Sequence, residues 1–156
     1  QLGDLLRELL AADSAPTVTL AREVAWLEGY LAIEQTRFAD RLTIAIEIAV
    51  ETQSLMVPRL LLQPLAENAV IHGMTNDSDV VRVRLSAHRE GSALVIDIEN
   101  NAGSPGPGAR GYGIGLSNTR ERLTTMYGDR QSVEFFPARD GIVKARVRIP
   151  YVLLAA

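Results

Sequence analysis

The sequence predicts an α+β fold: a two-layer sandwich of one mostly antiparallel, mixed sheet with helices on one face, preceded by N-terminal helices. Three observations predict this class. Apolar residues recur with helical spacing in some segments and alternate with a period of two in others. Helical and extended segments follow one another in the order typical of an α+β sandwich. Pairs of extended segments near residues 90 and 140 are joined by short turns that contain glycine, as in hairpins.

Two helices are expected before the first strand. Residues 2–12 carry leucines on one helical stripe, which a Pro-containing segment at 13–16 interrupts. Thr19 is the expected N-cap of the second helix, which extends to about Phe38. Its main apolar stripe is Leu20, Val24, Leu27 and Leu31, and its flanking stripe is Trp26, Tyr30 and Ile33. Contact with a partner outside the domain and coverage by the domain's own sheet are equally compatible with these two faces.

The remaining elements follow from periodicity and turn residues. The expected strands are 41–50, 80–88, 93–100, 132–138 and 142–149, and the further expected helices are 59–72 and 116–126. Pro58 suits the first position of the helix over 59–72. Pro64, inside the same helix, should cost a hydrogen bond and bend it. Residues 101–110 are rich in glycine and proline and are expected to form a mobile loop.

The composition limits the class of function. A chain of 156 residues that is 47% apolar can bury the core of one globular domain. A net charge of −3 provides no basic field, so no nucleic-acid partner is expected. The lack of cysteine excludes disulfides and thiolate metal sites, and two histidines are too few for a zinc cluster. No apolar run approaches the roughly 20 residues of a membrane span. A chain that begins with Gln1 and lacks a signal-peptide pattern is expected to be an excerpt of a longer protein.

Two segments together point to a magnesium-bound polyphosphate. The helical segment 60–73 places Glu67, Asn68 and His72 within about two turns. Segment 111–123 is a glycine-rich turn that opens a helix. Magnesium takes oxygen ligands, and phosphates bind the free backbone N–H groups at a helix N-terminus. We therefore expect Asn68 to ligate magnesium and the glycine-rich helix start to hold phosphates.

Alternatives remain open for these residues. Asn68 is also compatible with a buried structural hydrogen bond. Glu67 is compatible with orienting a water or a histidine, or with simple solvation. His72 is compatible with a ligand contact or with capping the helix end before Gly73. The glycines at 111, 113 and 115 are fed by a long loop rather than directly by a strand, which favours a lid and cradle over a Rossmann turn, and Arg110 is placed to reach phosphates.

These residues resemble the LytS/YehU-type sensor histidine kinases, within the superfamily of ATPases and kinases that includes gyrase B and MutL. The stretch VPRLLLQPLAENAVIHG at 57–73 resembles that family's N box. VIDIENNAG at 95–103 resembles its first glycine box, and GYGIGLSNTRERL at 111–123 resembles its second. The stretches LLREL at 5–9 and EVAWLEGYLAIEQTRFADRL at 23–42 are similar to the tail of its dimerisation region and its linker helix.

The resemblance implies a Bergerat-type ATP-binding fold with ATP and Mg²⁺ as cofactors. It implies a division into residues 1–38, the tail of the dimerisation helix and the linker helix, and residues 39–156, the catalytic domain. Asn68 would ligate Mg²⁺ and form the catalytic pair with Glu67. Asn100 would accept a hydrogen bond from the adenine amino group. The other implied nucleotide-binding residues are His72, Gly73, Ala102, Gly103, Arg110, Gly111, Gly113, Ile114, Gly115, Leu116 and Asn118, with 102–110 as the ATP lid.

The sequence departs from the family pattern at several positions. Asn100 stands in place of an aspartate, a loss of charge assistance on the order of 1 kcal/mol. Ala102 replaces a usual glycine, and Val143 replaces a common threonine. Pro64 stands where the superfamily's hydrolases have a water-activating glutamate. That last departure favours a kinase over an ATPase.

The function implied by the resemblance is transfer of the ATP γ-phosphoryl group to a histidine upstream of Gln1. The implied partners are ATP, a histidine-bearing dimerisation region and a response regulator. The implied full-length protein is a homodimer, with this domain cytoplasmic and the whole anchored in the inner membrane of a bacterium. A degenerate nucleotide-binding scaffold without kinase activity remains the alternative, motivated by the departures at Asn100, Ala102 and Val143.

Overall fold

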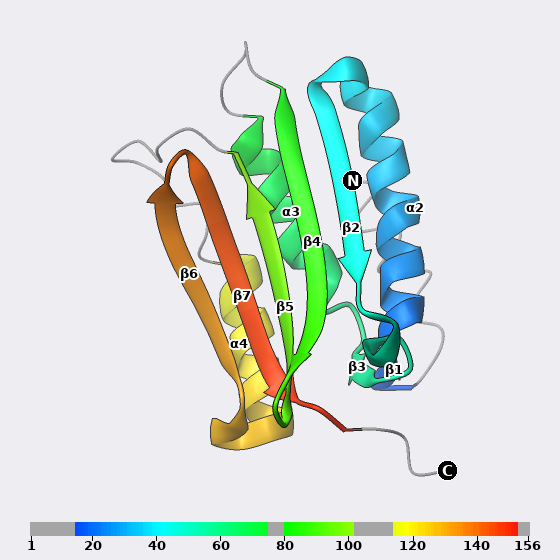
Figure 1. Cartoon of the computed structure of the whole chain (residues 1–156), viewed down its shortest axis with the longest axis vertical. Helices are drawn as coiled ribbons and strands as arrows, with labels where there is room; N and C mark the ends of the chain where they lie inside the picture. Colours follow the sequence, from blue (N-terminus) through cyan, green and yellow to red (C-terminus); the bar gives the residue numbers. More distant parts are fainter. Residues whose placement is uncertain (1–14, 75–79, 102–113, 153–156) are drawn as a thin grey trace.

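The computed structural model describes residues 15–74, 80–101 and 114–152 (Figure 1). Its main sheet has five strands in the order β2-β4-β5-β7-β6. These are β2 (Leu42–Ile48), β4 (Val81–Glu90), β5 (Ala93–Asn100), β7 (Ile142–Pro150) and β6 (Ser132–Arg139). β2 runs parallel to β4, and every other neighbouring pair is antiparallel. The predicted mixed, mostly antiparallel sheet is therefore confirmed.

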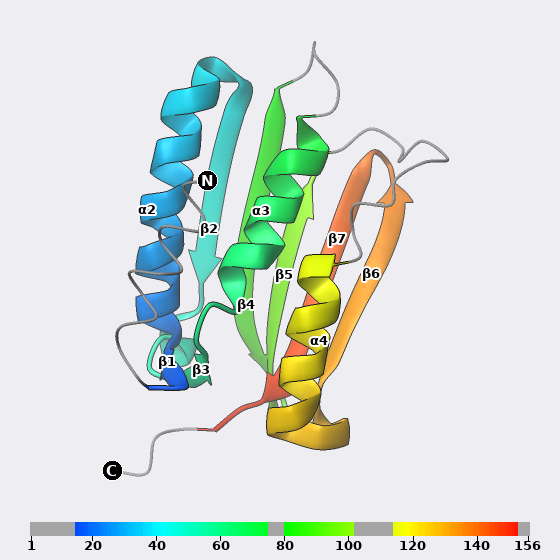
Figure 2. The same ribbon diagram turned by 180° about the vertical axis from the view of Figure 1, so that it is seen from behind.

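The described helices lie on one face of this sheet (Figure 2). They are α2 (Leu20–Phe38), α3 (Leu62–Gly73) and α4 (Ile114–Tyr127). Short 3-10 turns follow at Ala39–Arg41, Val50–Thr52 and Gly128–Arg130. The core between the layers includes Leu20, Leu27, Leu62, Val70, Leu85, Ile96, Leu123 and Ile149. The predicted α+β class, with helices on one face, is thus confirmed. None of the described helices is both long enough and apolar enough to cross a membrane.

Local chemistry explains several boundaries that the sequence predicts. Thr19 caps α2, because its Oγ1 accepts a hydrogen bond of 3.3 Å from the backbone N–H of Arg22. Gly91, with φ +61°, turns the chain between β4 and β5. Asp140 and Gly141 both have positive φ at the turn from β6 to β7, as a two-residue hairpin requires. On the flanking stripe of α2, Tyr30 is buried while Ile33 is 44% exposed.

The start of α3 differs from the prediction. Pro58 does not open the helix but ends a short strand, β3 (Met56–Pro58), which pairs antiparallel with β1 (Thr17–Thr19). The helix begins at Leu62, so Pro64 lies in its first turn. The first four N–H groups of a helix have no partner within it, so Pro64 removes no intrahelical hydrogen bond and the predicted cost is wrong.

Candidate nucleotide site

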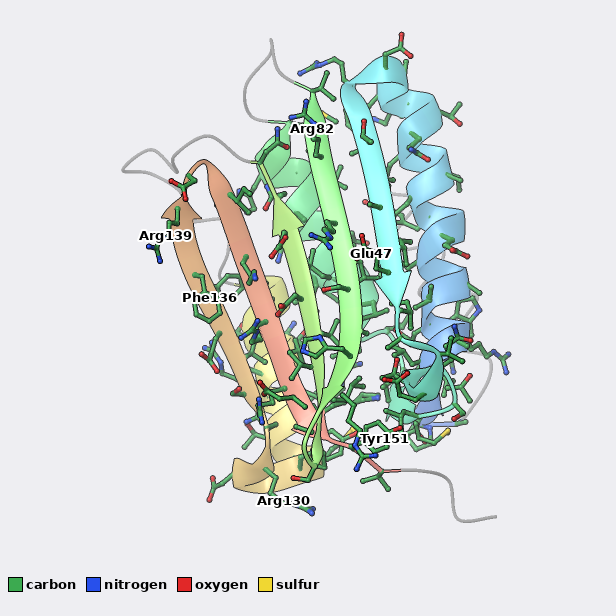
Figure 3. All side chains as sticks on the ribbon, viewed as in Figure 1. Glu47, Arg82, Arg130, Phe136, Arg139 and Tyr151 are labelled. Atoms are coloured by element: carbon green, nitrogen blue, oxygen red, sulfur yellow. The ribbon has the colours of Figure 1, made fainter. Side chains whose placement is uncertain are left out.

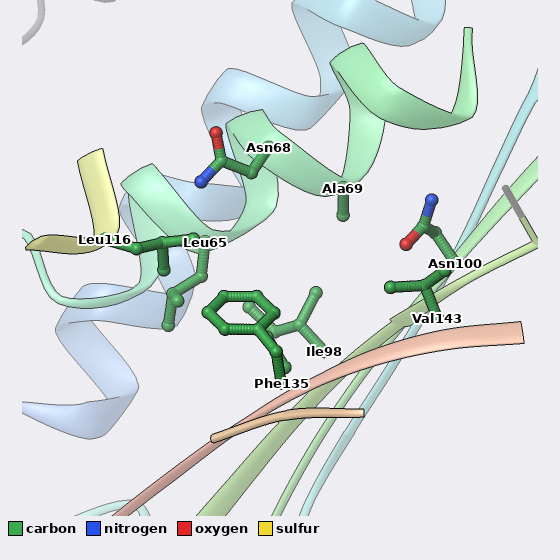
Figure 4. A pocket seen from close by; sticks show the side chains of 9 residues that line it. Leu65, Asn68, Ala69, Ile98, Asn100, Leu116, Phe135 and Val143 are labelled. Atoms are coloured by element: carbon green, nitrogen blue, oxygen red, sulfur yellow. The ribbon is translucent and has the colours of Figure 1, made fainter. Parts of the chain in front are cut away.

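A small pocket lies between the helix layer and one end of the sheet (Figure 4). Helix α3 contributes its upper wall, β5, β7 and β6 form its floor, and the first turn of α4 closes one side. The residues that line it are Leu65, Asn68, Ala69, Ile98, Asn100, Leu116, Phe135, Val143 and Ala145. The walls are therefore mainly apolar, with two carboxamides, which is the usual make-up of a small-molecule site.

Strand register explains how the floor forms. Asn100 on β5 pairs with Val143 on β7, and Ile98 pairs with Ala145 two residues further along. Ala145 in turn pairs with Phe135 on β6. Because side chains alternate between the faces of a strand, all five point to the same face of the sheet, towards α3. The site is thus assembled from paired neighbours on three adjacent strands.

Asn68 and Asn100 bring polar groups to this pocket from different elements. Asn68 is half-buried on α3, whereas Asn100 is only 4% exposed at the end of β5. The Nδ2 atoms of both amides are buried and have no hydrogen-bond partner among the described residues. A buried amide without a partner costs free energy unless a ligand or water satisfies it. The two amides therefore fit a polar ligand bound in this pocket.

The enclosed space is about 10 Å³, which is room for roughly one water molecule. A purine ring therefore enters only if the walls formed by α3, α4 and the sheet separate. No charged side chain lines the pocket within the described part of the chain. In the same ranges, no group of three or more His, Cys, Asp or Glu side chains is placed to hold a metal. A magnesium ion here would depend on the Asn68 oxygen, on ligand phosphates and on water.

The other predicted residues of α3 lie beside the pocket rather than in its lining. Glu67 is half-buried and accepts a hydrogen bond of 2.9 Å from Gln63 Nε2, one turn earlier. His72 is half-buried in the last turn. Gly73 is buried against β4: a Cβ atom there would lie 2.3 Å from Val81 Cγ1. The glycine at this position thus has a packing reason of its own.

Only some of the predicted phosphate-binding residues belong to the described helix α4. Leu116, in its first turn, lines the pocket, so the N-terminal end of this helix lies close to Asn68 and Asn100. Ile114 and Gly115 open the same turn, while the side chain of Asn118 is exposed. A helix N-terminus carries a partial positive charge and unpaired N–H groups. The predicted residues Ala102, Gly103, Arg110, Gly111 and Gly113 lie outside the described residues.

The sequence did not single out Leu65, Ala69, Ile98, Phe135 and Ala145. For the first two a signal exists, because Leu65 lies three residues before Asn68 and Ala69 lies four residues after Leu65, and both spacings place residues on the same side of a helix. Ile98 is two residues before Asn100 in the same strand and so shares its face. Phe135 and Ala145 come to the site through the pairing of β6 with β7, which periodicity alone does not specify.

Comparison with known proteins identifies the relatives of this chain. The family model described as Histidine kinase matches residues 1–42. The sensor histidine kinase BtsS of Escherichia coli K12 is 37% identical over 134 residues, which is 86% of this chain and 24% of that protein. The sensor histidine kinase YesM of Bacillus subtilis is 30% identical over 155 residues, covering 96% of this chain and 26% of that protein. The chain thus spans about a quarter of the length of these relatives.

Solved structures show the same fold. The catalytic domain of histidine kinase ThkA matches with a TM-score of 0.63 at 15% identity, covering 86% of this chain and 94% of that one. The histidine kinase domain of the blue-light activated kinase of Erythrobacter litoralis matches with a TM-score of 0.65 at 16% identity, covering 94% and 70%. The homologues of this chain are sensor histidine kinases of the LytS, YesM and BtsS group over most of its length, and its fold is that of a histidine kinase catalytic domain.

Proposed function

We propose that this chain is the ATP-binding catalytic part of a two-component sensor histidine kinase. In the full-length protein it would transfer the γ-phosphoryl group of ATP to a histidine upstream of this segment. One observation carries the proposal: the side chains of Asn68 and Asn100, whose Nδ2 atoms are buried and have no partner among the described residues, line one pocket together with the first turn of α4. The names of the relatives, which cover most of the chain, support it.

The two amides would contact different parts of the nucleotide: Asn68 the metal-bound phosphates and Asn100 the adenine. The Oδ1 of Asn68 would ligate Mg²⁺, which neutralises phosphate charge when it is bound. Asn100 would accept a hydrogen bond from the adenine amino group, and its Nδ2 would donate to the adjacent ring nitrogen, since an amide offers both functions. His72 and Gly73 would border the nucleotide, with Gly73 also admitting the close contact to β4. The cradle would comprise Gly111, Gly113, Ile114, Gly115, Leu116 and Asn118, and the lid would include Ala102, Gly103 and Arg110.

The reaction needs positioning more than proton transfer. Pro64 lies one helical turn before Asn68. The superfamily's hydrolases have a water-activating glutamate at this position, and proline has no side chain that can act as a base. Glu67, fixed by Gln63, would orient the acceptor histidine. Phosphoryl transfer then follows from alignment of the acceptor with the γ-phosphate and from neutralisation of its charge. A histidine acceptor, rather than water, is consistent with this arrangement.

The remaining features of the proposal concern the whole protein. The acceptor histidine would lie in a dimerisation region, so the working unit would be a homodimer. Residues 1–38 would comprise the tail of the dimerisation helix and the linker helix. A response regulator would take the phosphoryl group from that histidine. The full-length protein would be anchored in the bacterial inner membrane, with this domain on the cytoplasmic side.

Phosphotransfer in trans tests the function. The 156-residue chain, mixed with a separately produced dimerisation region of its own full-length protein and Mg–[γ-³²P]ATP, should label that region with acid-labile, alkali-stable phosphate. Asn68→Ala should lower the initial rate by at least about 100-fold, because the metal loses its protein ligand. The control is Gln35→Ala, which removes an exposed amide side chain on α2, outside the pocket lining, and should leave the rate within a few-fold.

Two results would contradict the proposal. Failure of the unmodified chain to bind Mg–ATP at millimolar concentration would favour the non-catalytic scaffold. Steady release of inorganic phosphate over many turnovers, without any labelled histidine, would favour a hydrolase.

A further inference from the structure

A carboxylate of α2 is buried at the start of the helix that carries Asn68. Glu23 is 3% exposed, although it lies in the first turn of a surface helix. Its Oε1 accepts a hydrogen bond of 2.6 Å from the backbone N–H of Leu60. Its Oε2 accepts bonds of 2.9 Å and 3.2 Å from the N–H groups of Leu61 and Leu62. One side chain thus satisfies three successive backbone donors that are 37 to 39 residues away in sequence.

Within the described residues, no nearby side chain caps these donors in its place. Leu61 is the N-cap residue of α3, and its side chain makes no capping hydrogen bond. Leu60, just before it, has φ +56°, a left-handed conformation that a bulky side chain rarely adopts. The negative charge of Glu23 lies at the positive end of the α3 dipole. The carboxylate therefore both caps the helix and stabilises the unfavourable turn before it.

A cation from α4 completes the contact. The Nη2 of Arg122 donates a hydrogen bond of 3.1 Å to the carbonyl oxygen of Leu60. Burial raises the pKa of Glu23, while the three N–H groups and the charge of Arg122 act against that rise. Burial also disfavours the charged form of Arg122 and so lowers its pKa, while the negative charge of Glu23 acts against that shift. The three helices of the layer thus meet at the backbone of Leu60–Leu62.

The backbone just before Glu23 is hydrogen-bonded to the chain that leads into Leu60–Leu62. Leu20 N–H donates to Leu55 C=O at 2.8 Å, and Ala21 N–H donates to Gln53 C=O at 3.0 Å. The β1–β3 pairing adds further contacts on the other side. The first turn of α2 is thus hydrogen-bonded to residues 53–62 at both ends of that segment.

We propose that Glu23 is a positioning residue of the nucleotide site, which sets the placement of α3, and with it Asn68, relative to α2 and α4. The proposal rests on the proposed function. Asn68 is six residues beyond Leu62 on one uninterrupted helix, a rise of about 9 Å. A shift at the start of α3 is therefore carried to the amide.

A comparison of Mg–ATP and Mg²⁺-free ATP binding tests this role. Glu23→Gln keeps the size of the side chain but removes the charge that caps α3. We expect it to weaken binding of Mg–ATP by about 10-fold or more, the usual effect of removing a group that orients a metal ligand. Binding of ATP in EDTA should change by less than about threefold, because Asn68 then has no metal to hold. Glu28→Gln, an exposed glutamate on the same helix, is the matched control and should not alter either constant.

A double-mutant comparison with Asn68 distinguishes a positioning role of Glu23 from a role in stabilising the fold. In the Asn68→Ala background, Glu23→Gln should have little further effect on Mg–ATP binding, since the group that it positions is gone. Independent, additive losses would overturn the proposal, as would an unchanged Mg–ATP constant in a folded Glu23→Gln chain. Trp26 is the single tryptophan of the chain, and Arg59 lies 5.6 Å from its ring, so its emission reports whether this junction is folded.

A milder variant covers the case in which Glu23→Gln does not fold. Glu23→Asp keeps the charge but shortens the reach by one methylene. It should weaken Mg–ATP binding to an intermediate degree, about threefold, with little change in EDTA, and an unchanged constant would overturn the proposal. Absence of Mg–ATP binding by the unmodified chain would instead contradict the proposed function, so the two failures are distinguishable.

Discussion

At the scale of single residues, Gly73 shows how close packing between a helix and a strand can require glycine. It ends α3 directly above Val81 on β4, and a Cβ atom would lie 2.3 Å from Val81 Cγ1. Real Cβ atoms do not approach other carbon atoms so closely, so a side chain at this position must push the helix away from the strand.

Gly73→Ala should therefore lower the free energy of unfolding by about 1–3 kcal/mol, the usual cost of overpacking. Urea denaturation followed by Trp26 fluorescence or circular dichroism measures this change. Gly29→Ala on α2 is the control, because nothing lies within 4 Å of the added Cβ atom. That substitution should stabilise the chain by up to about 1 kcal/mol through helix propensity. Equal effects of the two substitutions would show that the close approach to Val81 has no energetic consequence.

The residues of the candidate site were partly predictable. Asn68, Asn100 and Leu116 belong to motifs that the sequence displays, and they line one pocket in the structure. Phe135 and Ala145 could not be predicted as neighbours, because their contact depends on which strands pair and in what register. Asn118 was predicted from the glycine-rich motif, but its side chain is exposed on α4, and its role stays a prediction.

At the scale of elements, local chemistry was predictable and long-range capping was not. The N-cap at Thr19 and the two hairpins follow from residue types within a few positions. The start of α3 depends instead on Glu23, 39 residues before Leu62, so Pro58 gave a misleading local signal. The strands β1 and β3 have three residues each, which is too short for a period of two to be detected.

The direction in which β2 pairs could not be predicted from the sequence either. The alternation over residues 41–50 predicts a strand but contains no information on whether it pairs parallel or antiparallel. The structure pairs β2 parallel with β4, through the connection that includes α3. Such a connection places α3 against the sheet (Figure 2). Asn68 of this helix lines one pocket with Asn100 of β5 and Val143 of β7.

At the scale of the whole molecule, the two faces of the sheet differ in character. One face is covered by α2, α3 and α4, while the other carries charged side chains, among them Glu47, Arg82 and Arg139 (Figure 3). On this outer face Asp97 is 5% exposed and accepts two hydrogen bonds of 2.7 Å from Arg146. Lys144 Nζ lies 3.6 Å from the same carboxylate. Paired charges thus cover the sheet where no helix does.

Asp97 should make the stability of the chain sensitive to acid. Burial alone raises the pKa of Asp97, but the bonds from Arg146 and the charge of Lys144 outweigh it and hold the pKa below its ordinary 3.8. A lowered folded pKa contributes stability above the unfolded value, and this contribution is lost as the pH falls through the folded pKa. The free energy of unfolding should therefore fall below about pH 4 in the unmodified chain, and Asp97→Asn should flatten this dependence.

Urea denaturation between pH 2.5 and pH 7 measures the effect. At pH 7, Asp97→Asn should cost about 1 kcal/mol, a value kept small by the partial exposure of Arg146. Glu47→Gln is the matched control, because Glu47 pairs with Arg84 at 2.7 Å on the same face but both side chains are more than half exposed. It should change the free energy of unfolding by only a few tenths of a kcal/mol. An acid dependence that is identical in Asp97→Asn and in the unmodified chain would contradict the assignment.

The central claim is that a magnesium-bound nucleotide lies between Asn68 and Asn100. The most direct measurement follows the side-chain NH₂ resonances of both residues by NMR while a non-hydrolysable Mg–ATP analogue is added. Both pairs should shift along one saturation curve, the Asn68 pair should respond only when Mg²⁺ is present, and the exposed Gln35 amide on α2 should not move. Saturable binding that leaves the amides of Asn68 and Asn100 unchanged would contradict the account.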